Sequence, residues 1–371
     1  MTKFDADKFE EVMKKSKQKN RKKSILMVVI SVVLSIIFVL GILFGIFWMN
    51  DRHGYENAKY LEVKTRFMTP NVQTRNLPQS DIGLFNGKNI AEVEKDVDGY
   101  PVEWGNISGT YNIFTKLGKV DIYSIGGKSY PEGRRMNFFN PNITYKYITA
   151  DTQDKAIKEK NYTKKKGKNG SSWTRFPEDL YEKITYPNDL ENIVKAENRV
   201  VEVGISFDKP YTYEEVQKML PDNLTQAWYW VSEGEQASKK TEHIHLNDAD
   251  EDIFAPTVTF GYSNSSDFKY GDLQLGDYWK GDNGLNTAFE MLKTDYSLKM
   301  EKDEQKILDG ILKNNHLKNK KDMLLNGIVL TGRSENFKQL EGKSWIQAAS
   351  AGASAESLIS NQPNNSNSPF N

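Results

Sequence analysis

The chain has 371 residues, with 50 basic and 50 acidic side chains and no cysteine. The lack of cysteine excludes disulfides, thiol catalysis and cysteine-ligated zinc, so any folded part must be held by its hydrophobic core. Residues 1–23 hold nine Lys/Arg and four Asp/Glu, a net charge of +5, which leaves about −5 for the remainder. A slightly acidic bulk gives no reason to expect nucleic acid as a direct partner.

Residues 1–23 form the basic segment, which we predict to be a cytoplasmic tail. If this tail is helical, Phe9, Val12 and Met13 share one face at the spacing i, i+3 and i+4, and Phe4 lies about a turn and a half earlier. These four residues are the candidate partner-binding residues. Such a stripe can lie on anionic lipid or enter the groove of a protein partner. The alternative is an ordinary basic flank of a membrane span with an incidental apolar stripe.

Residues 24–49 are predicted to be a transmembrane helix. The stretch Ile25–Met49 contains no charge, and its 25 residues exceed the length needed to cross a hydrocarbon core of about 30 Å. Phe47 and Trp48 at its end are typical of an interfacial aromatic anchor, and no small-residue cleavage site follows. Lys22 and Lys23 directly precede the span within a strongly basic segment, whereas only Arg52 and His53 follow it directly. We therefore expect a single-pass protein in the cell membrane, with its N-terminus in the cytoplasm and its bulk outside.

Gly41 and Gly45 form a G-x-x-x-G pair inside the predicted span. Small residues at this spacing let two transmembrane helices approach closely, which predicts a dimer face. The alternative is that both glycines are simply tolerated in lipid.

Four segments are predicted after the span. We expect residues 50–150 to form a polar stalk and a strand-rich extracellular region, since Lys119–Ile125 alternates and Asn86-Gly87 and Asp98-Gly99 are typical hairpin turns. The charged, turn-rich residues 151–199 are predicted to be a linker or mobile loop. Residues 200–352 are predicted to be a folded α+β domain, and residues 353–371 a disordered tail.

The α+β prediction for residues 200–352 rests on two strand–helix–strand units. Alternation predicts a strand over Val200–Phe207, and Thr212 with Glu215 forms a capping box that opens a helix before a second, aromatic strand. The second unit has predicted strands over residues 324–330 and 345–351 around a short helix from residue 334, and further helices are predicted at 285–292 and 307–312. Two such units suggest a ferredoxin-like arrangement.

No motif for nucleotide, metal or nucleophilic chemistry is present in the sequence, so we predict no enzyme activity, no cofactor and no metal. Trp228 and Trp230 alternate on one face of the predicted aromatic strand. They are candidates for an exterior contact, and the alternative is packing in the core or between domains.

Several stretches of the chain resemble the sigma factor regulator family of low-GC Gram-positive bacteria, whose members are membrane-anchored anti-sigma factors. The C-terminal domain of that family is similar to VVEVGISFDKPYTYEEV at 200–216, WYWV at 228–231, NGIVLTG at 326–332 and the pair Phe337 and Leu340. Its N-terminal region is similar to residues 4–23 with the following span and to TPN at 69–71.

The resemblance implies an anti-sigma function. The tail would hold an extracytoplasmic-function sigma factor at the membrane, and the exterior domain would report on the cell envelope. A single helix buries less than the roughly 800 Å² per partner of a standard interface, so a membrane helper protein, dimerisation or lipid is expected to assist. The alternative from another class is a non-enzymatic surface module that binds wall polymer or a partner protein, with an inert tail.

Overall fold

The computed structural model describes residues 3–75, 79–116, 118, 120–124, 136–166, 170, 172–234, 240–245, 259–263, 293, 302–314 and 320–356. The chain divides into two compact units. Unit 1 comprises Met1–Asn57, Ser80–Asn89 and Thr110–Lys119, and unit 2 comprises Ala58–Gln79, Ile90–Gly109 and Val120–Asn371.

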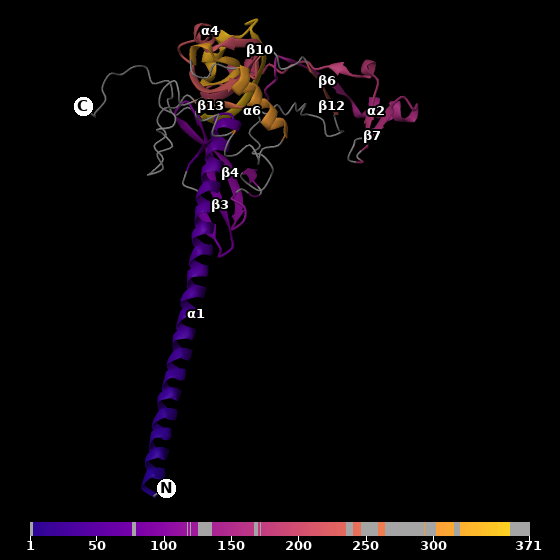
Figure 1. Cartoon of the computed structure of the whole chain (residues 1–371). Coiled ribbons are helices and arrows are strands. Elements are labelled where there is room, and N and C mark those ends of the chain that lie inside the picture. The colour runs from indigo at the N-terminus through magenta and orange to yellow at the C-terminus, as the bar shows by residue number, and fades with distance from the viewer. Residues whose placement is uncertain are drawn as a thin grey trace, which may run out of the picture. The chain divides into compact units, whose positions relative to one another are not determined.

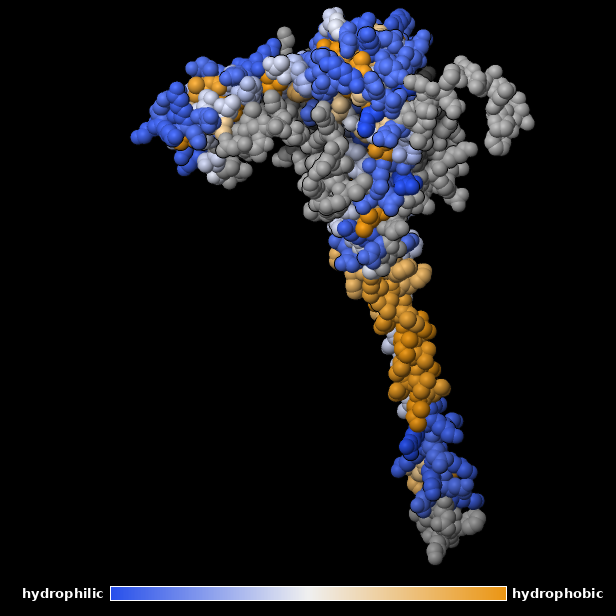
Figure 2. Space-filling model, turned by 180° about the vertical axis from the view of Figure 1, so that it is seen from behind, coloured by the Kyte–Doolittle hydropathy of each residue, from blue (hydrophilic) through white to orange (hydrophobic). Residues whose placement is uncertain are grey.

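A single helix, α1, runs without interruption over Lys3–Met68, a length of 66 residues (Figure 1). It shows that residues 3–23 and the apolar segment 24–49 are helical, and the helix continues where a stalk was predicted after residue 50. Figure 2 shows a continuous band of hydrophobic residues along α1 between two hydrophilic stretches. This is one helix long and apolar enough to cross a membrane, and its most apolar window buries nothing against the described residues. These features are consistent with single-pass membrane anchoring.

Residues after α1 form a five-stranded sheet of the order β1-β3-β4-β5, with β2 paired to β3. The strands are β1 (Gln73–Thr74), β2 (Gln79–Ile82), β3 (Asn86–Val97), β4 (Tyr100–Asn112) and β5 (Val120–Ser124). Asp98 and Gly99 adopt φ of 55° and 85° between β3 and β4, which confirms the predicted hairpin turn there. The other predicted turn is displaced, because Gly83 donates its N–H to the carbonyl of Asn86 and Asn86-Gly87 begins β3.

The segment predicted to be a linker instead carries regular structure. It contains α2 (Ala150–Lys158), β7 (Thr163–Lys166), β8 (Ser172–Arg175), η1 (Glu178–Leu180), β9 (Glu182–Lys183) and α3 (Leu190–Val194). β6 (Ile143–Ile148) joins β9 and β12 (Lys240–His245) in a three-stranded sheet. Thr149 caps α2, and Ile148, Ala156 and Phe176 form a small buried cluster. A few buried apolar side chains therefore hold residues 150–176 in a regular fold although the surface of this segment is charged.

The C-terminal region of unit 2 is built on an antiparallel sheet of the order β13-β11-β14-β10-β15. Its elements are β10 (Arg199–Thr212), α4 (Tyr213–Met219), β11 (Thr225–Val231), β13 (Gly261–Ser263), α6 (Lys302–Asn314), η5 (Lys320–Asp322), β14 (Leu324–Arg333), η6 (Ser334–Leu340) and β15 (Ile346–Glu356). The α+β prediction is confirmed. The predicted capping box is present, since Thr212 and Glu215 exchange side-chain and backbone hydrogen bonds at the start of α4.

One boundary and one helix type differ from the predictions for this region. β15 continues to Glu356, past residue 353 where the disordered tail was predicted to begin, and residues 357–371 lie outside the described residues. The helix of the second unit is a 3-10 helix, η6. The helix predicted at 285–292 lies outside the described residues, whereas the one at 307–312 is confirmed as part of α6.

Candidate functional site

The N-terminal part of α1 presents an exposed apolar face. Phe9, Val12 and Met13 are 68 %, 64 % and 44 % exposed, so the described residues leave this stripe uncovered. Glu11 pairs with Lys15 at 2.7 Å on another part of the helix surface. Phe4 belongs to α1, but its side chain lies outside the described part. The geometry offers a narrow stripe of the kind that enters a protein groove or lies on lipid.

Gly41 and Gly45 both lie on the apolar part of α1. A Cβ atom on either glycine would meet no atom of the described residues within 4 Å. The dimer face that these two residues predict is therefore open on the helix surface and stays a prediction.

Trp228 and Trp230 lie in the core and not at an exterior face. They are 0 % and 2 % exposed on β11, and they pack with Phe138 and Val329. The ring of Phe138 meets Trp230 edge-on at 5.3 Å between centroids. Of the two alternatives for this pair, the structure therefore shows core packing. β14 pairs with β11 along one edge, and the segment around Phe138 packs on the two rings. Neither ring is accessible for an exterior contact.

Trp228 also makes a polar contact with the end of α1. Its indole Nε1 donates a hydrogen bond to the carbonyl of Arg66 at 3.0 Å. Arg66 is two residues from the end of α1, where helix carbonyls lack partners inside the helix. A core residue of the C-terminal sheet thus caps the helix that carries the apolar band.

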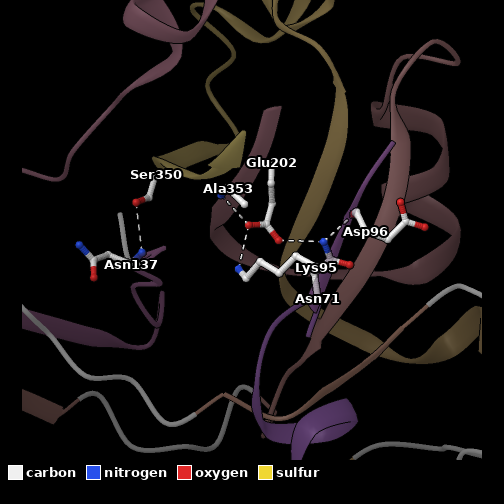
Figure 3. A network of polar contacts seen from close by, with 7 residues as sticks. All are labelled: Asn71, Lys95, Asp96, Asn137, Glu202, Ser350 and Ala353. Carbon is white, nitrogen blue, oxygen red and sulfur yellow. Dashed lines mark hydrogen bonds and ion pairs between the residues drawn. The ribbon is translucent and has the colours of Figure 1, made fainter. Parts of the chain in front are cut away.

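Glu202 lies at the centre of a buried network of polar contacts (Figure 3). Its side chain is 0 % exposed on β10 and accepts three hydrogen bonds: from Lys95 Nζ at 2.8 Å, from Asn71 Nδ2 at 2.8 Å and from the N–H of Ala353 at 3.0 Å. Asn71 also donates to the carbonyl of Asp96 at 3.0 Å. A buried carboxylate with three donors and a cationic partner avoids the large cost of an uncompensated charge.

Four parts of the chain meet at Glu202: the segment after α1, the β3–β4 hairpin, β10 and β15. Sequence reasoning missed this, because alternation predicts that Val200, Glu202, Gly204 and Ser206 face water. In the structure both faces of β10 are buried over Val200–Phe207. Residues 136–140 cover the second face, with Phe139 N–H donating to Ser206 Oγ at 3.0 Å and Asn137 N–H donating to Ser350 Oγ at 3.1 Å. The sequence did contain one signal of this buried network: Glu202 is a single acidic residue among small residues in an otherwise apolar strand.

A second ion pair lies on α1 near its end. Glu62 and Arg66 are 3.3 Å apart with side chains only 8 % and 17 % exposed. Burial raises the pKa of Glu62, and the nearby guanidinium of Arg66 offsets part of that rise. We call the set formed by Glu62, Arg66, Trp228 and the Glu202 network the polar junction.

A small open cavity of about 240 Å³ adjoins the polar junction. Asn71 and Thr331 are buried in its lining, and Asp98 at its rim accepts a hydrogen bond from Thr225 Oγ1 at 2.8 Å. The hydroxyl of Thr331 has no hydrogen-bond partner among the described residues. A cavity of this size and polarity fits a ligand no larger than a single sugar or amino acid.

Two family models match the chain. The model described as sigma factor regulator N-terminal matches residues 10–102, and the model described as sigma factor regulator C-terminal matches residues 190–353. Together they cover more than half of the sequence. No curated protein and no solved structure matches it. The polar junction joins the two matched regions, since Asn71, Lys95 and Arg66 belong to the first and Glu202, Trp228 and Ala353 to the second.

Proposed function

The chain belongs to the sigma factor regulator family, and we propose from this premise that it is a membrane-anchored anti-sigma factor. In this proposal the tail faces the cytoplasm and holds an extracytoplasmic-function sigma factor of a low-GC Gram-positive bacterium. The span is α1, and the remainder lies outside the cell and responds to the state of the envelope.

The family matches carry this proposal, and the exposed stripe of α1 supports it. The N-terminal match begins at residue 10 and takes in both the second half of the stripe and the apolar band. Aliphatic and aromatic groups that are more than two-fifths exposed on a helix favour a partner with an apolar groove. The interface is small for one helix, so a membrane helper protein or a dimer through Gly41 and Gly45 is part of the proposal.

The polar junction supports a route for the signal. It connects the end of α1 to the C-terminal sheet through a hydrogen bond and includes a buried ion pair between β3 and β10, and such polar arrangements have few alternative geometries of similar energy. A ligand or envelope stress that alters the sheet would change the position of the last turns of α1. We also propose a ferredoxin-like fold for residues 200–352, which the strand order β11-β14-β10-β15 favours.

The test compares two double variants of the full-length protein. Phe9→Ser with Val12→Ser replaces the two most exposed residues of the apolar stripe. Lys14→Ser with Gln18→Ser makes the same number of serine substitutions on the opposite side of the helix. Each protein is captured from solubilised membranes and its bound proteins are identified. Transcripts are profiled in the same strains.

The stripe variant is expected to lose a sigma factor from the captured proteins and to switch on a discrete regulon with one promoter type. The control variant is expected to behave as wild type. Wild-type capture that never enriches a sigma factor, with an unchanged transcriptome in the stripe variant, would refute the proposal.

The second candidate is a surface module that binds a small wall-derived or partner group. The cavity beside the polar junction favours it, because the buried Thr331 hydroxyl lacks a hydrogen-bond partner among the residues that the structure describes. In this case replacing residues 1–23 with an unrelated basic segment leaves function unchanged. The family is regulatory, and we propose no catalytic activity for either candidate.

A further inference from the structure

Three large apolar side chains are exposed at the tips of two turns in unit 1. Phe114 is 88 % exposed, Phe85 is 53 % and Leu84 is 43 %. Phe114 lies in the turn after β4, and Leu84 and Phe85 lie in the turn before β3. We call these three residues the aromatic tip. Both turns are held by hydrogen bonds, so the fold keeps these three side chains exposed.

The first turn is fixed to α1 by Asn50. The side-chain Nδ2 of Asn50 donates to the carbonyl of Gly83 at 2.7 Å and to that of Asn86 at 3.2 Å. Gly83 N–H also donates to the Asn86 carbonyl at 2.8 Å, which closes the turn. One buried helix side chain therefore holds both ends of the turn, and Leu84 and Phe85 lie between those ends.

The second turn is fixed to the next part of the same helix. His53 Nδ1 donates to the carbonyl of Asn112 at 2.7 Å, and the side-chain oxygen of Asn112 accepts the N–H of Phe114 at 2.8 Å. Ile113 N–H donates to the carbonyl of Phe85 at 3.0 Å, so the two turns are also bonded to each other. The aromatic tip is thus one rigid set of side chains beside residues 50–53 of α1.

This location coincides with the end of the apolar band. Ile25–Met49 is 25 residues long, which is about 37 Å of helix against a hydrocarbon core of about 30 Å. Asn50 is the first polar residue after it, so a spanning α1 puts residues 47–53 in the interfacial layer. In Figure 2 the hydrophobic band broadens at the end where it meets the hydrophilic residues. The interfacial layer is where aromatic side chains are enriched in membrane proteins.

We propose that the aromatic tip inserts into the lipid interface at the C-terminal end of the span, as a second membrane contact beside α1. The proposal rests on α1 crossing a membrane. Continuity with the apolar band selects lipid as the occupant, because the hydrogen bonds to Asn50 and His53 hold the tip at that depth. A second contact point fixes the rotation of unit 1 about the long axis of α1 in the membrane. The orientation of unit 1 then depends on the lipid packing of the leaflet that the aromatic tip enters.

The absence of cysteine in the chain allows a direct test. Lys116→Cys, exposed and next to the second turn, carries an environment-sensitive fluorophore in the full-length protein in vesicles. Some vesicles contain lipids with a quencher near the headgroup. The same label at Leu34→Cys reports on the span itself, and at Lys218→Cys on an exposed position of α4. The Lys116→Cys label is measured with the wild-type tip and with Phe85→Ser and Phe114→Ser.

We expect a blue-shifted, quenched signal at Lys116→Cys with the wild-type tip and a water-like, unquenched signal with the two serines. Lys218→Cys is expected to be water-like throughout. A water-like signal at Lys116→Cys with the wild-type tip, while Leu34→Cys reports a lipid environment, would overturn the proposal and leave the span intact. A water-like signal at Leu34→Cys would remove the span and overturn both.

Discussion

Replacing Lys95 with methionine is the sharpest perturbation of the polar junction. Lys95→Met keeps the length of the side chain and removes the cation that faces Glu202 at 2.8 Å. Glu202 stays buried and keeps the donors of Asn71 and Ala353, but its charge loses compensation. Removing one partner of a buried pair costs about 3–5 kcal/mol. For a folded region of this size we expect the melting temperature to fall by about 6–20 °C.

The assay is thermal unfolding of the full-length protein in detergent, followed by tryptophan fluorescence. Trp228 and Trp230 report on the same region, because both are buried in the sheet that carries Glu202. The double variant Lys95→Met with Glu202→Gln removes both charges, but the new amide –NH2 replaces one of the two accepting oxygens, so one donor and the amide N–H groups are left poorly paired. Its expected loss is smaller, about 1–3 kcal/mol.

A matched control makes the same chemical change at a solvated pair. Lys218 lies 3.2 Å from Glu214 on α4, with side chains 73 % and 58 % exposed. Lys218→Met is expected to change stability by no more than about 0.5 kcal/mol. A fall in melting temperature for Lys95→Met that equals this control, or a double variant less stable than Lys95→Met alone, would refute the reasoning.

Three further predictions concern single positions near the polar junction and in the C-terminal sheet. Trp228→Phe removes the donor to the Arg66 carbonyl and is expected to cost about 1–3 kcal/mol in urea unfolding; an unchanged midpoint contradicts the cap. Thr212→Ala removes the helix cap and is expected to lower the free energy of unfolding by about 0.5–2 kcal/mol in the same measurement. Thr212→Ser keeps a capping hydroxyl and is expected to retain most of the wild-type stability. Gly327→Ala puts a Cβ against the carbonyl of Ile205 on the neighbouring strand, so we expect at least about 1–3 kcal/mol and faster proteolysis of the sheet; wild-type resistance would be the contrary result.

Local patterns in the sequence predict much of this fold. The apolar band, the Thr212–Glu215 capping box and the strands over β10, β11, β14 and β15 each depend on residues within a few positions of one another. Periodicity and capping chemistry identify such elements because the hydrogen bonds that define them are local. The stripe at Phe9, Val12 and Met13 was likewise predictable as one face of a helix, and the structure leaves it exposed.

The polar junction and the aromatic tip were not predictable in this way. Glu202 and Lys95 are separated by 107 residues, and alternation alone sends Glu202 to the solvent side of its strand. Residues 50–57 read as a polar stalk, yet Asn50, Gly54 and Asn57 recur at i, i+4 and i+7 and are buried on one helix face. That polar periodicity is the signal that indicates a docked face, and only the tertiary structure says what docks there.

The face of α1 formed by residues 50–57 has a consequence for cleavage of the protein next to its apolar band. Asn57 donates to the carbonyl of Thr110 at 3.1 Å, and Asn89 donates to the carbonyl of Gly54 at 2.7 Å, so this part of the helix is covered by the hairpin strands. Proteases cut exposed, extended backbone, and a covered helix has to unfold locally first. The free energy that holds the hairpin against α1 therefore sets how often this stretch becomes a protease substrate, and any signal that loosens the hairpin raises the cleavage rate without changing the protease.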